Sequence, residues 1–312
     1  MSQLALSTMW MQKRHASLGE FFDAARELGF ERFELSHTVS EDMVRAASLP
    51  AGDIPSVHAP CPTHPQTRGA QMSSPDKEER ARAVEAIASS IRLAQELGAN
   101  VVVVHAGRVA VNPLLETELR ALYDQGLQET EEYADLKSEL AEERERHAER
   151  HLDATLWSLE QLANAADAAG VKLCLENRVH YYEIPLPDEL DLLLRELAGP
   201  LAFCFDTGHA YILEQLGYVH HDEWLSSFAG HLAIAHLHDV RVARAGSEPS
   251  DHLVLGTGLQ DHVVPSTGVV DFAAVLHRAP QGTLFTCEFD WYHSPEEVQA
   301  GLAYLQAQKP GF

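Results

Sequence analysis

Cysteine is scarce in this chain of 312 residues, and its four cysteines form no CxxC pair. A disulfide framework or a cysteine-based zinc module requires several cysteines at close and regular spacing. The sequence therefore excludes both kinds of protein. We interpret the four residues as small, reduced members of the core: Cys61, Cys174, Cys204 and Cys287.

Basic residues are also few. The chain has 23 Lys and Arg against 47 Asp and Glu, which gives a net charge of −24 with His neutral. Proteins that bind nucleic acid present a positive surface to the phosphate backbone. The charge balance therefore argues against a nucleic-acid partner.

Long apolar runs are absent as well. The longest, such as 101–104, are far shorter than the roughly 20 residues that cross a bilayer. The basic residues Lys13 and Arg14 follow the apolar stretch 4–11, whereas a secretory signal places its positive residues first. We therefore expect no membrane association and a cytoplasmic location.

No linker rich in proline, glycine or serine divides the chain, which alternates between short β-rich runs and longer amphipathic stretches. The predicted strands are 4–8, 32–35, 54–58, 100–105, 171–176, 201–206, 232–237 and 283–289. The predicted helices are 18–28, 39–47, 75–97, 152–169, 190–197, 210–228, 272–277 and 295–306. Three of these helices stop directly before a glycine, which is typical of a helix C-terminus. Eight βα units that close on themselves form a TIM barrel. We predict an α/β fold, a (β/α)8 barrel, as a single domain over residues 1–312.

Two segments account for the residues that exceed the length of a minimal barrel. Residues 108–150 follow the fourth strand, and 129–150 contain nine acidic and four basic residues. This composition predicts a solvated helical insertion, and its surface is the natural contact for a homo-oligomer. Residues 239–270 follow the seventh strand and predict a long loop on the C-terminal rim, where active sites of such barrels form.

Six of the eight predicted strands carry a His, Asp or Glu as their last or last but one residue. These residues are His58, His105, Glu176, Asp206, His236 and Glu288. A barrel brings the C-terminal ends of all its strands to one rim, so distant residues can share one cavity.

The last four of these residues come from four consecutive strands, the fifth to the eighth. Three carboxylates crowded together are costly unless a cation holds them. Three carboxylates and one imidazole form an oxygen-rich set, which suits Mn²⁺, Co²⁺ or Mg²⁺, while Zn²⁺ stays open. The alternative is a network of salt bridges to Arg178, Arg108 or Arg241, which does not account for the histidine.

Several short motifs resemble those of a known family. They are LENR, FDTGHA, HLHD and HLxLGxG, preceded by VHAP and VVHAG. Over nearly the whole chain the sequence is similar to the xylose-isomerase-like TIM barrel superfamily, the sugar phosphate isomerase/epimerase group that includes apurinic endonucleases of the endonuclease-four type. The resemblance implies one divalent metal held by Glu176, Asp206, His236 and Glu288. It also implies that Glu176 and Glu288 are the acid/base pair, acting through a metal-bound enediolate.

The resemblance implies roles for other residues less specifically. His209 matches a position that hydrogen-bonds substrate oxygens, unless it only caps a helix, and His238 is a substrate contact or a substitute metal ligand. His58 and His105 line the substrate pocket or hold a second metal. His252 matches a further ligand position, and Arg178 and Arg241 are rim cations for the substrate.

The endonuclease-like members of the superfamily use a D-x-H ligand pattern for part of a three-zinc cluster. Here the aspartate before His252 is displaced by one position, and Gln260 stands two before His262. Neither His252 nor His262 is therefore preceded by the aspartate of this pattern, which would be a zinc ligand.

We therefore predict a metal-dependent isomerase or epimerase of a small carbohydrate. A phosphodiester hydrolase, a barrel that only binds metal and sugar, and dehydration of a polyol ketone are the alternatives.

Overall fold

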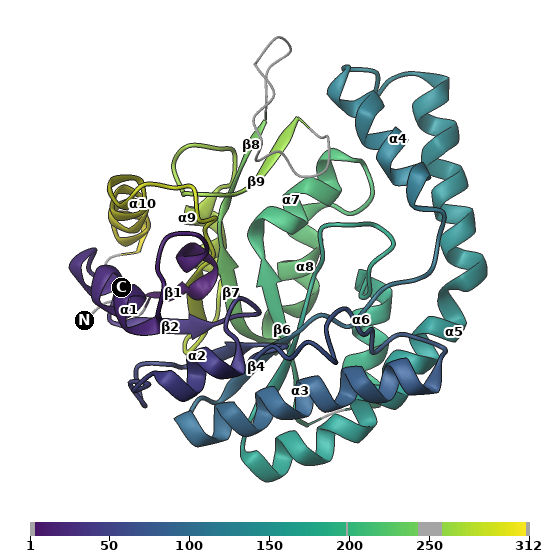
Figure 1. Cartoon of the computed structure of the whole chain (residues 1–312). Helices are drawn as coiled ribbons and strands as arrows, with labels where there is room; N and C mark the ends of the chain where they lie inside the picture. Colours follow the sequence, from purple (N-terminus) through teal and green to yellow (C-terminus); the bar gives the residue numbers. More distant parts are fainter. Residues whose placement is uncertain (1–3, 198, 243–257, 310–312) are drawn as a thin grey trace.

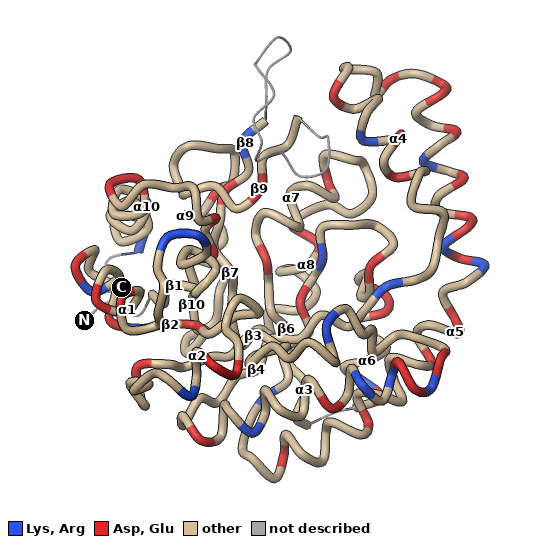
Figure 2. The backbone as a smooth tube through the Cα atoms, in the orientation of Figure 1, with Lys and Arg blue, Asp and Glu red and all other residues tan. Residues whose placement is uncertain are grey.

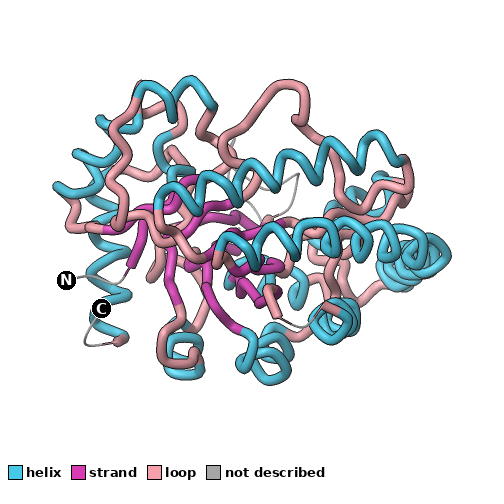
Figure 3. Tube along the Cα trace, turned by 90° about the horizontal axis from the view of Figure 1, so that it is seen from below, coloured by secondary structure: helices cyan, strands magenta, loops and turns pink. Residues whose placement is uncertain are grey.

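Eight parallel strands close into a barrel in the computed structural model, which describes residues 4–197, 199–242 and 258–309. The barrel strands are β1 (Leu4–Ser7), β2 (Arg32–Leu35), β3 (Ser56–His58), β4 (Val101–Val104), β5 (Lys172–Glu176), β6 (Leu201–Asp206), β7 (Leu232–Leu237) and β10 (Leu284–Cys287). Their order around the barrel follows the chain, and β10 pairs with β1 to close it. The predicted (β/α)8 fold is confirmed, with strands inside and helices outside (Figures 1 and 3).

The helices lie between the strands as the sequence predicts, with two differences. They are α1 (Leu18–Glu27), α2 (Glu41–Ala46), α3 (Lys77–Leu97), α4 (Pro113–Asp124), α5 (Glu131–Ala169), α6 (Pro187–Glu196), α7 (Thr207–Gln215), α8 (His221–Phe228), α9 (Phe272–Arg278) and α10 (Pro295–Gln308). The helix predicted at 210–228 is two helices, because Gly217 takes a φ of 77° and turns the chain. The helix predicted from 152 begins 21 residues earlier, at Glu131. No helix within the described ranges has both the length and the apolar character needed to cross a membrane.

The strand alternation places small residues inside the barrel and the polar strand ends above them. Cys174 and Cys204 are fully buried there with valine, alanine and isoleucine side chains. Glu176 and Asp206 stand two residues further along the same strands, so they point to the same interior face. This arrangement fixes a packed floor beneath the polar groups.

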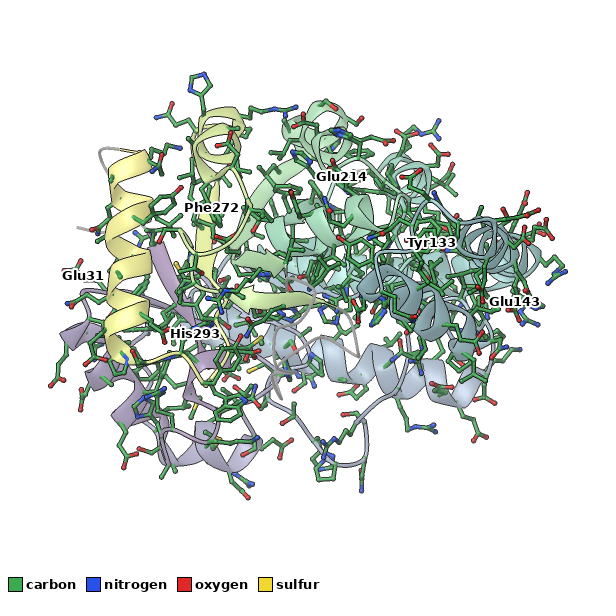
Figure 4. All side chains as sticks on the ribbon, turned by 90° about the horizontal axis from the view of Figure 1, so that it is seen from above. Glu31, Tyr133, Glu143, Glu214, Phe272 and His293 are labelled. Atoms are coloured by element: carbon green, nitrogen blue, oxygen red, sulfur yellow. The ribbon has the colours of Figure 1, made fainter. Side chains whose placement is uncertain are left out.

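The insertion forms a helical arm, which we define as residues 113–150 of α4 and α5. Its outer surface is charged, as predicted (Figure 2), and Glu143 lies at its outer edge in Figure 4. Its inner surface is not solvated, which corrects the prediction. Leu119 and Tyr133 are buried in a second apolar cluster with Leu216 of the α7–α8 connection and with Leu259. The arm is therefore packed against the rim of its own barrel.

Leu119→Ala should lower the free energy of unfolding by about 2–5 kcal/mol, because Leu119 is fully buried beneath the arm. Leu114→Ala on the same helix should change it by less than about 0.5 kcal/mol, because Leu114 is 59% exposed. Denaturant unfolding of both variants measures the difference. Equal losses would show that the arm does not pack as described.

The segment predicted as a long rim loop contains regular structure. β8 (Asp239–Val242) and β9 (Leu259–Val263) form a two-stranded antiparallel sheet, and residues 243–257 lie outside the described ranges. Asp239 accepts hydrogen bonds from the backbone N–H groups of Gly268 and Val270 and so fixes the return of the chain. A side chain at position 268 would collide with the carbonyl oxygen of Val240, which explains the glycine.

Candidate metal centre

Four strand ends meet at the C-terminal mouth of the barrel, as the sequence predicts. Glu176 ends β5, Asp206 ends β6, His236 lies in β7 and Glu288 follows β10. All four side chains are at most 3% exposed, and one donor atom from each lies within 4.8 Å of the others. We refer to these four residues as the quartet. Its geometry fits one small cation.

The imidazole of His236 is oriented by a carboxylate beneath it. Its Nε2 lies 3.2 Å from Oε1 of Glu34, and Glu34 in turn accepts a hydrogen bond of 2.7 Å from the hydroxyl of Ser56. Nδ1 of His236 then faces Glu288 at 3.1 Å and Glu176 at 3.4 Å. Neither this Nδ1 nor Oε1 of Glu176 has a hydrogen-bond partner in the described ranges, although both are buried. A buried ring nitrogen that faces carboxylates without a hydrogen bond is the environment that a metal ion satisfies.

Two glutamates of the quartet are held in the ionised form. Burial raises the pKa of Glu176, but the guanidinium of Arg178 and the ring of His105 outweigh it and place the pKa well below its usual value. Burial also raises the pKa of Glu288, and the neighbouring His236 outweighs it in the same way. Both groups are therefore carboxylates at neutral pH, which is the form that binds a cation or accepts a proton.

A second group of donors lies on one side of the quartet. His58 donates from Nδ1 to the carbonyl of Ala59 at 3.1 Å, which leaves its Nε2 free to face inward. That Nε2 lies 3.1 Å from Nε2 of His105, and the His105 atom lies 2.8 Å from Oε2 of Glu176. Partial burial and the charge of Arg178 lower the pKa of His105 to about 4, so its ring is neutral. The structure thus brings both predicted histidines to Glu176.

A third group of donors comes from the start of α7 and from β9. His209 donates from Nδ1 to the carbonyl of Asn177 at 3.2 Å, and His262 donates from Nδ1 to the carbonyl of Glu288 at 3.2 Å. The Nε2 atoms of both rings then face Oδ2 of Asp261, at 3.7 and 3.8 Å. His262 adopts a φ of 49°, which is uncommon for a residue other than glycine and aims its ring at this group.

His238 connects the third group to the quartet. Its Nε2 lies 2.8 Å from Oδ1 of Asp206, and its Nδ1 lies 3.1 Å from Oδ1 of Asp261. Neither candidate histidine has an aspartate two positions before it in the sequence. The structure nevertheless brings Asp261, which is adjacent to His262, into the third group. His252 lies outside the described residues.

Gly208→Ala should destabilise the protein by about 1–3 kcal/mol, because a Cβ there would lie 2.2 Å from Cε1 of His238 and 2.9 Å from Oδ1 of Asp261. Gly230→Ala should change stability by less than about 0.5 kcal/mol, since nothing lies within 4 Å of the added atom. Denaturant unfolding measures both. A neutral Gly208→Ala would mean that His238 is free to move.

The predicted arginines occupy different surroundings. Arg178 donates to Glu176 at 2.9 Å, so one salt bridge of the alternative network exists. Arg241, on β8, donates across the two-stranded sheet to Gln260 at 3.1 Å, and Arg108 is exposed at the rim. Within the described ranges, neither Arg241 nor Arg108 pairs with a carboxylate of the quartet. Arginine therefore offsets the charge of only one of the three carboxylates, Glu176.

One histidine near the site, His37, was not predicted from the sequence. Its ring lies 6.4 Å from that of His58, at the mouth of the barrel. Burial and the neighbouring His58 lower its pKa to about 4. No local pattern marked it, because it stands in a polar turn after β2 rather than at the end of the strand.

A family model described as xylose isomerase-like TIM barrel matches residues 22–308. No curated protein sequence matches this chain. Among solved structures, it is similar to a D-tagatose 3-epimerase-like protein, with a TM-score of 0.61, 18% identity, and 98% of this chain and 97% of that chain covered. It is similar to the 3-keto-D-glucoside 4-epimerase YcjR from E. coli, with a TM-score of 0.62, 15% identity, and 98% and 100% covered. It is also similar to the TTHB071 protein from Thermus thermophilus, soaked with ZnCl2, with a TM-score of 0.59, 22% identity, and 99% and 98% covered.

Proposed function

The chain belongs to the xylose isomerase-like TIM barrel family, and we propose on this premise that it is a metal-dependent isomerase or epimerase of a small carbohydrate. The observation that carries the proposal is the buried quartet of Glu176, Asp206, His236 and Glu288, with its unpartnered Nδ1. These residues would hold one divalent ion. The donor set suits Mn²⁺, Co²⁺ or Mg²⁺, and Zn²⁺ also binds such ligands.

The two glutamates supply the acid/base chemistry. When bound, the ion would supply a Lewis acid that makes a proton beside the substrate carbonyl more acidic. One of the pair, Glu176 or Glu288, takes this proton from carbon. Return of a proton to the opposite face of that carbon gives an epimer, and return to the adjacent carbon gives an isomer. Each positioned proton transfer contributes on the order of 10²–10⁴ in rate.

The remaining polar groups position the substrate. His209 and His58 are fixed by backbone carbonyls, so their Nε2 atoms point into the site, where substrate hydroxyl groups would compete with the present contacts to Asp261 and His105. Arg178 holds Glu176 in place. Several of the similar structures are described as epimerases, which supports this class of substrate for the barrel without identifying the sugar.

Exchange of solvent deuterium into ketohexoses tests the proposal. The purified protein, loaded in turn with Mn²⁺, Co²⁺, Mg²⁺ and Zn²⁺, is incubated in D₂O with each ketohexose, and NMR detects carbon-bound deuterium and new isomers. We expect exchange with at least one sugar. No exchange into any ketohexose with any of the four ions would reject the proposal.

One observation favours a second candidate, a phosphodiester hydrolase of the apurinic endonuclease type. The two flanking groups of donors adjoin the quartet, one through Glu176 and the other through the contact of His238 with Asp206, so the site offers up to three neighbouring ion positions. Metal clusters of this kind stabilise both oxygens of a phosphoryl displacement. The net charge of −24 opposes DNA binding.

Metal content and nicking separate the two candidates. One ion per chain by elemental analysis, with ketose exchange, supports the isomerase. Two or three zinc ions per chain, together with nicking of a supercoiled plasmid that carries abasic sites, would favour the hydrolase.

A further inference from the structure

A cavity of about 190 Å³ lies beside the candidate metal centre, between α3 and the segment that follows β3. His105 forms part of its wall and at the same time contacts Oε2 of Glu176 at 2.8 Å. The side chain of His105 is 38% exposed, whereas those of the quartet are at most 3% exposed. One imidazole ring therefore separates this cavity from the carboxylate.

The wall of the cavity combines a face of small apolar residues with polar residues, which are Thr67, Gln71, His105, Arg108 and Glu183. Ala83, Ala86 and Ile87 of α3 form one side, and Ala70 and Met72 form the other. A cavity of about 150 Å³ with apolar walls accommodates benzene. The space beside His105 is therefore large enough for a six-membered ring with one substituent.

Hydrogen bonds from buried side chains hold the segment over the cavity in place. Ser158 of α5 donates to the carbonyl of Met72 at 2.8 Å, and His151 of α5 donates to the carbonyl of Ser73 at 2.8 Å. Arg80 donates to the carbonyl of Ser74 at 2.7 Å. The cavity is thus formed before any ligand enters.

The charges that line the cavity favour a neutral occupant. Glu183 and the exposed Arg108 both line it, and they are opposite in charge. Glu183 lies 3.5 Å from Arg178, and its pKa is lowered because burial is outweighed by that guanidinium, so it is a carboxylate. A phosphate group in the cavity would meet this carboxylate as well as Arg108.

We propose that this cavity binds a neutral, apolar ring carried by the substrate, so that the substrate is a sugar or polyol derivative bearing such a group rather than a free sugar or a sugar phosphate. The reaction of this substrate rests on the proposed function. The presence of the ring is inferred from the cavity alone. The polar strand ends bind the hydroxyl groups, and the cavity binds the ring on the other side of His105.

Benzyl alcohol tests the cavity without reference to turnover. We expect saturable shifts of the methyl signals of Met72 and Ile87 when it is titrated into the metal-loaded protein and followed by NMR. Ala86→Phe and Ala70→Phe, which fill the cavity from two independent segments, should each weaken binding at least about tenfold. Glu85→Phe adds the same ring on the exposed side of α3 and should leave binding unchanged. Absence of saturable shifts, or unchanged binding in the folded cavity variants, would overturn the proposal.

A matched pair of substrates tests the link to the reaction. We compare deuterium exchange into a ketohexose and into its 6-O-benzyl derivative. The parent protein should favour the benzyl derivative in kcat/KM by about tenfold or more, and Ala86→Phe should remove this preference. Exchange without such a preference would overturn the inference and leave the proposed function intact. No exchange with either sugar would count against the proposed function, while benzyl alcohol binding still decides the cavity.

Discussion

Glu176→Gln should abolish metal binding at the quartet and reduce turnover by about 10²–10⁴-fold or more. Glu176 is fully buried and faces the quartet through Oε1 and the His58/His105 pair through Oε2. An amide removes the negative charge from both places and leaves the guanidinium of Arg178 without its closest carboxylate. Elemental analysis of the purified variant and deuterium exchange into substrate measure the two effects.

Glu183→Gln is the matched control for this experiment. Glu183 also lies near Arg178, at 3.5 Å, but contributes no donor atom to the quartet. We expect Glu183→Gln to retain the metal and to lose no more than about 10–100-fold in activity, as for other residues that support a ligand. A Glu176→Gln variant with full metal content and activity would remove Glu176 from the centre.

Chelation should lower both activity and thermal stability. Without a cation, the carboxylates of Glu176, Asp206 and Glu288 lie together in a site that is at most 3% exposed, which is costly. An ion at about 1,000 times its dissociation constant adds about 4 kcal/mol to the free energy of unfolding. We expect Tm to fall on the order of 5–10 °C after dialysis against EDTA and to recover when the ion is restored.

His236→Ala distinguishes this effect from a general action of the chelator. The variant lacks the imidazole whose Nδ1 faces the carboxylates, so its Tm should respond weakly to EDTA or to added metal. A parent protein whose Tm and turnover are the same before and after removal of all divalent metal would contradict the proposed centre.

The barrel strands could be predicted because each is a short apolar run followed by a polar residue and bounded by turn residues. The run 201–206 is the observed β6, and 232–237 is the observed β7. The quartet could be predicted for the same reason, since the closed barrel brings strand ends together whatever lies between them. Its four donors lie within 4.8 Å of one another without any contribution from a long loop.

The third donor group could not be predicted from strand ends. Asp261 and His262 lie in β9, whose place is set by pairing with β8 rather than by the barrel. The rotation of His262 inward depends on its positive φ, which the sequence does not reveal. Glu34 could be placed at a strand end, but its contact with His236 joins strands that are not neighbours in the barrel.

The packing of the helical arm limits how this protein could be shortened. Leu119 and Tyr133 of the arm help to cover three fully buried side chains, those of Ile212, Leu216 and Leu259. A trimmed barrel that lacks residues 113–150 would expose these apolar side chains at the mouth of the site and would be prone to self-association. Engineering a minimal version of this scaffold would therefore require polar replacements on α7 and β9 at the same time as the deletion.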